Sequence, residues 1–286
     1  MPANLPQPVD PRAPRLLASD LDGTLLPPPT SPAGRAAVDR FKEFVRATGL
    51  RLAYVTGRHL NHALEGVNGV GLPLPEAFAC DVGTTIFWRN EEVARPEAFR
   101  LDAEYRAMIA ATPGVIESSD VQASLVDVAG LTLQEPDKQT AFKTSYYADP
   151  RRLPHVVDEV RKRLAPLGRA RLVVSEDLHL GRGMLDVLPE GVGKATAVEF
   201  IRERLSLERH DLVFAGDSGN DRDAMLNASP AIAVANTPED LKVELRDEAA
   251  RLGRSDSIFF SPSPFATGVM EGLRHFGILD RSIRRS

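Results

Sequence analysis

The sequence predicts an α/β fold in which a doubly wound parallel-sheet core is interrupted by a smaller, inserted α+β cap domain. In the first and last thirds of the chain, short and nearly continuous apolar segments alternate with amphipathic segments of helical period. This pattern is typical of parallel strands that helices cover on both faces. In the middle third, longer and more polar segments alternate apolar and polar residues, as in a sheet with one exposed face. We therefore expect the order core, cap, core along the chain.

The first third contains two predicted strands, residues 15–19 and 50–55, and the helix between them. The helix should begin at Pro32 with Ser31 as its N-cap, because a serine oxygen accepts a hydrogen bond from a free amide there and proline suits the first position. Gly49 suits its C-terminal end. The apolar face of this helix consists of Ala37, Phe41, Phe44, Val45 and Thr48.

The last third repeats the pattern. Its predicted strands are residues 211–215, 231–235 and 257–261, and its predicted helices are residues 194–205, 238–252 and 266–276. Helices on both sides of such strands make a Rossmann-like core, in which ligands bind outside the carboxyl ends of the strands.

The middle third is expected to form the cap. Residues 140–148 alternate as in a half-buried strand, with Phe142 and Tyr146 in one set and Lys143 in the other. Residues 152–164 have a helical apolar stripe. The resulting division is a disordered leader at 1–14, core at 15–90 and 183–286, and the cap at 91–182.

Composition narrows the function classes. The chain has 286 residues with 35 basic and 40 acidic side chains, so its formal net charge of -5 gives no general attraction to nucleic acid or to an anionic membrane. No apolar run reaches the roughly 18 residues of a membrane span, and the leader lacks the apolar stretch of a signal peptide. Cys80 is the single cysteine, which fits a reducing compartment. We expect a cytoplasmic protein.

Polar segments follow the first two predicted strands. The first, 20–24 (DLDGT), holds Asp20 and Asp22, two carboxylates that are costly so close together unless they are paired or bind a metal. The second, 55–58 (VTGR), offers the Thr56 hydroxyl and the amide of Gly57 to a phosphate. Each segment alone is also compatible with a plain turn, because aspartates cap turn amides.

Two further segments lie in the second half of the core. Lys194 stands at a predicted helix N-terminus, where a positive charge is unfavourable, so an anionic partner would explain it and a solvated lysine is the alternative. The spacing of a P-loop fails, because alanine follows this lysine. The last segment, 214–221 (FAGDSGND), places Asp217, Asn220 and Asp221 in a glycine turn after a strand. Hard oxygen ligands of this kind indicate a Mg²⁺ site.

In order and in strand context, these segments together resemble the haloacid dehalogenase superfamily of phosphatases. The residues within these segments are similar to those of its sucrose-phosphate phosphatase branch, which includes mannosylfructose-phosphate phosphatase relatives. The likeness spans nearly the whole chain after the leader, although it is thin through 95–135. It extends to residues 80–84 (CDVGT), 143–146 (KTSY), 185–189 (LDVLP) and 268–277 (GVMEGLRHFG).

The resemblance implies a Mg²⁺-dependent phosphatase that hydrolyses a sugar phosphate, most of all sucrose 6-phosphate, through an aspartyl phosphate on Asp20. Asp22 would be the general acid and base, with Thr56 and Lys194 completing the catalytic set. The implied metal ligands are Asp20, the main-chain carbonyl of Asp22, Asp217 and Asp221, and the implied phosphate-binding residues are Thr56, Gly57, Lys194 and Asn220. Lys143 and Tyr146 would be the substrate-binding residues of the cap, and by alternation at most one of them reaches the sugar.

Other functions stay open at this point. The substrate could be mannosylfructose phosphate or another glycosyl phosphate, since cap sequences diverge while the core motifs can still be recognised. A phosphomutase uses the same aspartyl phosphate, and a non-catalytic sugar-phosphate-binding pseudoenzyme would have no use for the proton chemistry of Asp22. The sequence leaves open the oligomeric state, and whether a sugar-phosphate synthase associates with the enzyme and hands over its substrate.

Overall fold

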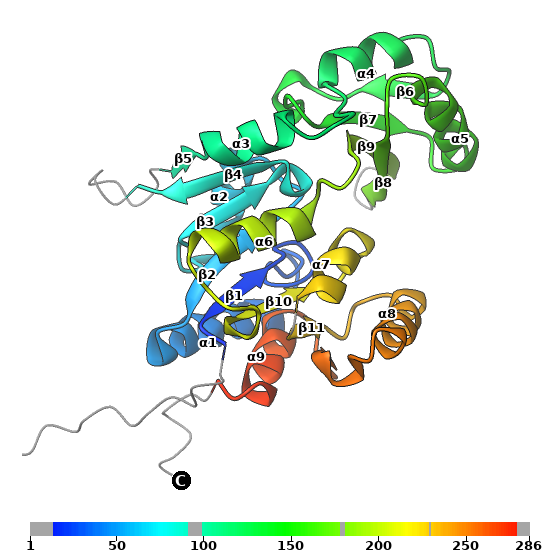
Figure 1. Cartoon of the computed structure of the whole chain (residues 1–286). Coiled ribbons are helices and arrows are strands. Elements are labelled where there is room, and N and C mark those ends of the chain that lie inside the picture. The colour runs from blue at the N-terminus through cyan, green and yellow to red at the C-terminus, as the bar shows by residue number, and fades with distance from the viewer. Residues whose placement is uncertain (1–13, 91–98, 178–180, 229, 279–286) are drawn as a thin grey trace, which may run out of the picture.

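The structure is a computed structural model that describes residues 14–90, 99–177, 181–228 and 230–278. Two sheets organise these residues, one of eight strands and one of four. Figure 1 shows the four-stranded sheet and its helices, in green, set apart from the larger sheet. Of the expected leader, only Pro14 belongs to the described residues.

The larger sheet has the strand order β12-β11-β10-β1-β2-β3-β4-β5. The pairings from β12 to β3 are parallel, and β4 and β5 are added antiparallel at one side. This confirms the predicted α/β class. The strands are β1 (Leu16–Ser19), β2 (Arg51–Val55), β3 (Ala77–Cys80), β4 (Thr85–Arg89), β5 (Phe99–Leu101), β10 (Leu212–Gly216), β11 (Ala231–Ala233) and β12 (Ile258–Phe260).

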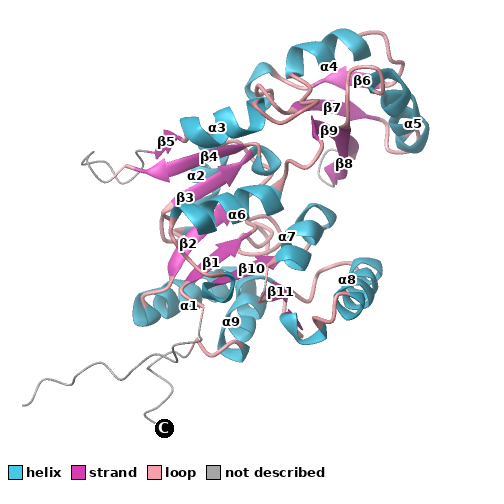
Figure 2. Cartoon of the chain, in the orientation of Figure 1, coloured by secondary structure: helices cyan, strands magenta, loops and turns pink. Residues whose placement is uncertain are grey.

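Helices cover both faces of this sheet, as Figure 2 shows. Successive residues of β1 serve opposite faces, with Leu16 and Ala18 in one apolar cluster and Leu17 in the other. The first cluster is completed by α3 (Ala103–Ala110), α6 (Lys194–Arg204), α7 (Arg222–Asn227) and α8 (Glu239–Arg251), and the second by α1 (Pro32–Thr48), α2 (Leu60–Val70) and α9 (Phe265–His275).

The ends of α1 follow the predicted capping chemistry. The Ser31 Oγ accepts a hydrogen bond from the Gly34 amide at 3.1 Å, and Pro32 occupies the first helical position. Gly49 ends the helix in the left-handed conformation with φ 70°. After Gly49 the chain turns back and enters β2, which lies beside β1 in the sheet.

The smaller sheet is antiparallel, with the order β6-β7-β9-β8. Two helices pack on one face of it around a separate apolar cluster that includes Tyr146, Val160 and Leu185. Its elements are α4 (Ser118–Leu125), β6 (Leu131–Leu133), β7 (Thr144–Ala148), α5 (Leu153–Leu164), β8 (Ala170–Asp177) and β9 (Arg182–Pro189). We call this unit the cap.

Two expectations differ from the structure. The predicted strand over 140–148 begins only at Thr144, because the Thr140 amide donates to the Lys143 carbonyl at 3.0 Å and closes a turn instead of joining the ladder. The predicted cap limits of 91–182 also differ from the division between the sheets. Strand β5 and helix α3 belong to the core, where Tyr105 is buried in the first apolar cluster, whereas β9 belongs to the cap sheet.

Candidate active site

The polar segments of the core meet where the parallel strands end. Strands β1 and β10 are neighbours in register, with Ser19 opposite Ala215. The next amide along, that of Asp20, donates to the Ala215 carbonyl at 2.9 Å. Asp20 and Asp217 therefore leave the sheet side by side at its carboxyl edge, the place at which α/β folds bind ligands.

Three carboxylates and one ammonium gather at this edge. Asp20, Asp217 and Asp221 each offer an oxygen within 4.8 Å of the others. Lys194 at the start of α6 is 1% exposed, and its Nζ donates at 2.6 Å both to Asp20 Oδ1 and to Asp221 Oδ1. Residues that are far apart in the sequence thus form one buried charged cluster.

Two glycines allow this approach. Gly23 has φ +78°, and a Cβ there would lie 2.3 Å from Asp217 Oδ2. At Gly216 a Cβ would lie 2.6 Å from Asp221 Cγ. Both positions need a residue without a side chain, the first also for its left-handed backbone.

Hydrogen bonds fix the orientation of the acidic side chains. Asp221 Oδ2 accepts from the amides of Asp217 and Ser218 at 3.1 and 3.0 Å, and from the Ser218 hydroxyl at 3.0 Å. Asp217 accepts from the Thr24 hydroxyl at 2.8 Å and from the Asn236 side-chain amide at 3.0 Å. Asn236 follows β11 and has no motif around it in the sequence, so sequence reasoning missed it.

The cluster carries more negative than positive charge. Burial raises the pKa of Asp20 well above its ordinary value; Lys194 opposes this, and the neighbouring carboxylates add to it. Burial, reinforced by Asp221, raises the pKa of Asp217 to about 7. For Lys194, burial alone would lower the pKa, but the two adjacent carboxylates outweigh it and raise the pKa. The ammonium therefore stays charged, and fully ionised carboxylates would leave two negative charges uncompensated.

This donor set fits a magnesium ion. Carboxylate oxygens are the ligands that Mg²⁺ prefers, at about 2.0–2.1 Å, so oxygens on opposite sides of one ion lie about 4.2 Å apart. The three carboxylates span no more than 4.8 Å. A divalent cation would also balance the excess charge of the cluster.

Asp22 lies at the mouth of the site. Its carboxylate is about half exposed and accepts two hydrogen bonds from Arg58, at 2.7 Å from Nε and 2.5 Å from Nη2. Arg58 also donates to the main-chain carbonyl of His62 at 3.1 Å, so α2 holds the guanidinium in place. The sequence shows Arg58 beside Thr56, but spacing alone did not reveal that it positions Asp22.

The expected phosphate-binding residues also lie beyond strand ends. Thr56 follows β2 and is fully buried, and its Oγ1 accepts from the Arg58 amide at 3.1 Å. Gly57 is the next residue and is half-buried. Asn220 lies in the turn that also carries Asp221, and its side-chain oxygen accepts from the Ser218 hydroxyl at 3.0 Å.

The two expected cap residues have different surroundings. Lys143 is buried, and its Nζ lies 3.0 Å from Ser145 Oγ and 3.6 Å from Asp81 Oδ1 of the core. Ser145 in turn donates to Asp186 at 2.6 Å. Tyr146 packs instead in the apolar cluster of the cap. Lys143 is therefore the one of the two that connects the cap with the core.

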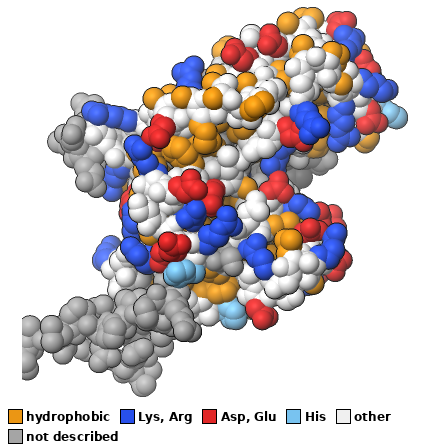
Figure 3. Space-filling model, in the orientation of Figure 1, with side chains coloured by type: hydrophobic (Ala, Val, Ile, Leu, Met, Phe, Trp, Pro, Cys, Tyr) orange, Lys and Arg blue, Asp and Glu red, His pale blue; other side chains and the backbone are white. Residues whose placement is uncertain are grey.

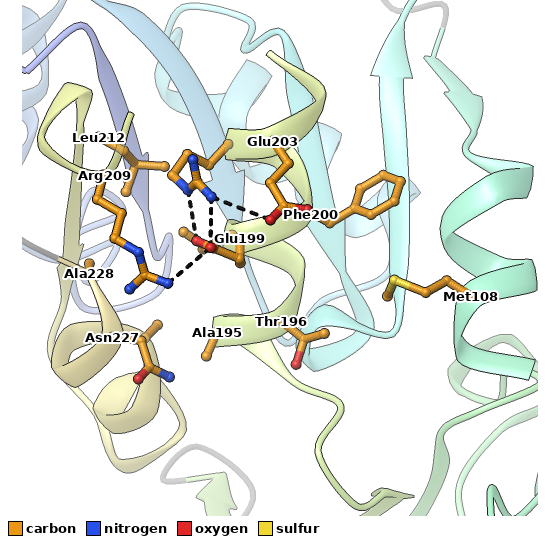
Figure 4. A pocket seen from close by; sticks show the side chains of 13 residues that line it. Met108, Ala195, Thr196, Glu199, Phe200, Glu203, Arg209, Leu212, Asn227 and Ala228 are labelled. Carbon is orange, nitrogen blue, oxygen red and sulfur yellow. Dashed lines mark hydrogen bonds and ion pairs between the residues drawn. The ribbon is translucent and has the colours of Figure 1, made fainter. Parts of the chain in front are cut away.

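A cavity of about 380 Å³ lies along α6, away from these residues (Figure 4). Met108 and Phe200 are among its lining side chains. Glu199 accepts there from Arg202 at 2.8 Å and from Arg209 at 3.2 Å, so these charges largely neutralise one another. The lining includes no residue of the charged cluster. This cavity is not the candidate active site.

On the face shown in Figure 3, acidic and basic side chains are intermixed. Within residues 14–90, 99–177, 181–228 and 230–278, no helix combines the length and the apolar character that crossing a bilayer would need.

Comparison with known proteins identifies the family. The profile of the sucrose-6F-phosphate phosphohydrolase family matches residues 13–277. A putative HAD-like hydrolase of Nitrosococcus oceani is 33% identical over 273 residues, which cover 91% of this chain and 71% of that protein. A mannosylfructose-phosphate phosphatase of Agrobacterium fabrum is 29% identical over 276 residues, which cover 93% and 98%.

A solved structure is similar throughout. The sucrose-phosphatase of Synechocystis, determined in complex with sucrose and phosphate, superposes with a TM-score of 0.74 at 25% identity, covering 92% of this chain and 98% of that one. The family match spans almost the whole chain, and the fold is that of haloacid dehalogenase phosphatases with a cap. The chain therefore belongs to the sucrose-6F-phosphate phosphohydrolase family of the haloacid dehalogenase superfamily and is a phosphoric monoester hydrolase.

Proposed function

We propose that this chain is a Mg²⁺-dependent phosphatase that hydrolyses a sugar phosphate, sucrose 6-phosphate first among them, through an aspartyl phosphate on Asp20. The observation that carries the proposal is the buried cluster in which Asp20, Asp217 and Asp221 lie within 4.8 Å of one another while Lys194 donates to two of them. A nucleophile, a cation site and a fixed positive charge are the parts that phosphoryl transfer needs.

Asp20 is the proposed nucleophile. One of its oxygens attacks phosphorus, and the bond between phosphorus and the sugar oxygen breaks on the opposite side. Lys194 keeps the Asp20 carboxylate oriented through the 2.6 Å hydrogen bond to Oδ1, which leaves Oδ2 for the attack. Water then cleaves the aspartyl phosphate, which releases phosphate and restores the carboxylate.

Asp22 is the proposed proton carrier. It gives a proton to the departing sugar oxygen and later takes one from the attacking water. Its half-exposed place at the mouth of the site suits contact with both groups, and Arg58 fixes its direction. General acid–base catalysis of this kind contributes about 10²- to 10⁴-fold.

The proposed Mg²⁺ ligands are Asp20, Asp217 and the main-chain carbonyl of Asp22, with Asp221 in support. The ion would offset the repulsion between the phosphate and the carboxylate. This repulsion amounts to about 4 kcal/mol per charge pair at a distance of 4 Å and a dielectric constant of 20. The Thr56 hydroxyl, the Gly57 amide and the Asn220 side chain are the proposed donors to the phosphate oxygens, together with Lys194. Their places beyond β2 and in the turn after β10 support this assignment.

Lys143 is the proposed contact to the sugar, with Asp81 as its partner. Asp81 Oδ1 is buried and has no hydrogen-bond partner among the described residues. The Lys143 ammonium lies 3.6 Å from it, beyond hydrogen-bond distance. A sugar hydroxyl both accepts and donates, so it could bridge these two groups, which neither a cation nor an anion alone can do. Tyr146 contributes packing within the cap.

The relatives support a glycosyl phosphate but leave its identity to experiment. Turnover of sucrose 6-phosphate, mannosylfructose phosphate and other sugar phosphates should be compared by kcat/KM in the presence of Mg²⁺. A marked preference for sucrose 6-phosphate supports the first choice, and a preference for mannosylfructose phosphate selects the alternative. Phosphate released without any bisphosphate activator excludes a phosphomutase, and a complete lack of turnover would identify a pseudoenzyme. Association with a sugar-phosphate synthase stays a prediction, which co-elution of the two proteins would test.

A further inference from the structure

A second group of possible metal ligands lies between the core and the cap, outside the acidic cluster. His59 and His62 stand at the start of α2, and Asp137 lies in a short 3-10 turn (Pro136–Lys138) that precedes β7 of the cap. One ligand atom from each lies within 4.8 Å of the other two. The three side chains come from both parts of the molecule.

The detailed geometry of this group suits a tetrahedral ion. Zinc binds histidine nitrogen and carboxylate oxygen at about 2.0–2.1 Å, so two ligands of one tetrahedral ion lie about 3.4 Å apart. His59 Nε2 and Asp137 Oδ2 are 3.7 Å apart, which requires a movement of only a few tenths of an ångström. The two imidazole rings meet edge to face with their centroids 4.1 Å apart.

The ring nitrogens that face away from Asp137 have different surroundings. His59 Nδ1 is buried and has no hydrogen-bond partner among the described residues. Lys138 Nζ lies 2.8 Å from His62 Nδ1, and because an ammonium can only donate, it occupies the lone pair of that nitrogen, so an ion bound by His62 has to displace Lys138. A neutral imidazole is the form that binds metals.

We propose that His59, His62 and Asp137 form a zinc-type site that clips the cap to the core and differs from the magnesium site in its nitrogen ligands. Two imidazoles and one carboxylate suit zinc and cobalt better than magnesium, which prefers oxygen ligands only. Three protein ligands leave the fourth position to water. The ammonium of Lys138 already lies against the site as a competing positive charge.

Cobalt(II) absorption on the full-length protein tests the site directly. In saturating Mg²⁺, added Co²⁺ should give the visible bands of a tetrahedral ion with nitrogen ligands, and Zn²⁺ should displace it with a stoichiometry of one per chain. An ion in the all-oxygen acidic cluster is close to octahedral and absorbs far more weakly. Bands that are absent in the wild type, or that persist in the His59→Asn/His62→Asn double variant, would overturn the proposal.

Single variants assign the ligands. Loss of an outer-shell partner commonly weakens metal binding by about 10- to 100-fold, so loss of the ligand in Asp137→Asn should weaken it at least as much. His210→Ala changes an exposed histidine elsewhere and should leave binding unchanged. Lys138→Met removes the competing charge and should bind Co²⁺ at least as tightly as the wild type. Loss of Co²⁺ binding in His210→Ala or in Lys138→Met would contradict the ligand assignment.

Hydrogen exchange tests whether the bound ion connects the cap with the core. Zn²⁺ should slow exchange of the amides of residues 59–63 and of residues 137–140 together, and the His62→Ala variant should lose this protection in both segments. Protection confined to one segment would show that the ion does not join cap and core. These readouts do not depend on catalysis, so they hold whether or not the proposed sugar-phosphate chemistry is correct.

Discussion

The replacement Asp217→Asn should stabilise the metal-free protein although it removes a proposed metal ligand. In the folded protein the pKa of Asp217 is raised from its ordinary value of 3.8 to about 7, mainly by burial and then by Asp221. Each unit of difference between these two pKa values lowers the free energy of unfolding by about 1.4 kcal/mol at a pH where the carboxylate is ionised in both states. The full penalty is therefore about 4 kcal/mol. A rearranged hydrogen bond to Asn236 would cost about 1 kcal/mol, which leaves a gain of about 3 kcal/mol.

The sign of the effect depends on pH. Below about pH 3 the carboxyl group is protonated in both the folded and the unfolded chain, so the variant and the wild type should be alike. As the pH rises towards 7, the wild type progressively loses stability because the unfolded chain ionises more easily than the folded one. The gain of the variant should therefore grow between pH 4 and 7 and stay constant above that range.

Urea denaturation in EDTA at pH 4, 6 and 8 measures this gain. Mg²⁺ at about 1,000 times its Kd should reverse the order, because it stabilises a binding protein by about 4.1 kcal/mol and the variant should bind it poorly. Asp223→Asn is a matched control, since Asp223 pairs with Arg171 at 2.9 Å outside the cluster. A metal-free Asp217→Asn protein that is less stable than the wild type at pH 8, or equal stabilisation of both by Mg²⁺, would refute the reasoning.

Four further substitutions test the remaining assignments. Asp20→Asn should abolish phosphate release while circular dichroism and the melting curve stay native-like, and substantial residual turnover would exclude Asp20 as the nucleophile. Asp22→Asn should lower kcat by about 10²- to 10⁴-fold without loss of Mg²⁺ binding, and an unchanged kcat would assign the proton transfer elsewhere. Asp81→Asn should raise KM for the sugar phosphate but leave nitrophenyl phosphate turnover nearly unchanged; an equal effect on both substrates would argue for a structural role. Gly23→Ala should weaken Mg²⁺ binding measured by calorimetry, because its Cβ would lie 2.3 Å from Asp217 Oδ2, and unchanged affinity would show that the loop adjusts freely.

Most of the core was predictable because local chemistry and global fold agree there. The capped helix that follows Ser31 and the buried strands around Asp20 have short-range signals that the tertiary structure does not override. The order of the motifs along the chain also indicated which residues meet, because parallel strands bring their carboxyl ends to one edge.

The remaining features depend on contacts between distant residues. Nothing in the sequence around Asn236 shows that its amide reaches Asp217, and nothing around Arg58 shows that its guanidinium faces Asp22. The predicted cap limits differ from the division between the sheets because β5 is only three residues long, and its membership of the core sheet follows from its pairing with β4. The pairing of Lys143 with Asp81 likewise arises only when the cap lies on the core.

The route by which the chain leaves the cap has a mechanical consequence. Strand β9 ends at Pro189, and α6 begins at Lys194, so a short turn joins the last strand of the cap to the ammonium that touches Asp20. Beside this turn, Gly83 of the core lies so near Gly193 that an added Cβ would be 2.4 Å from its carbonyl carbon. Any movement of the cap relative to the core would therefore be transmitted through this short turn to Lys194, with the loop after β3 packed against the turn. If the cap holds the substrate as proposed, binding there would influence Asp20 through the backbone, without a side chain that spans the distance.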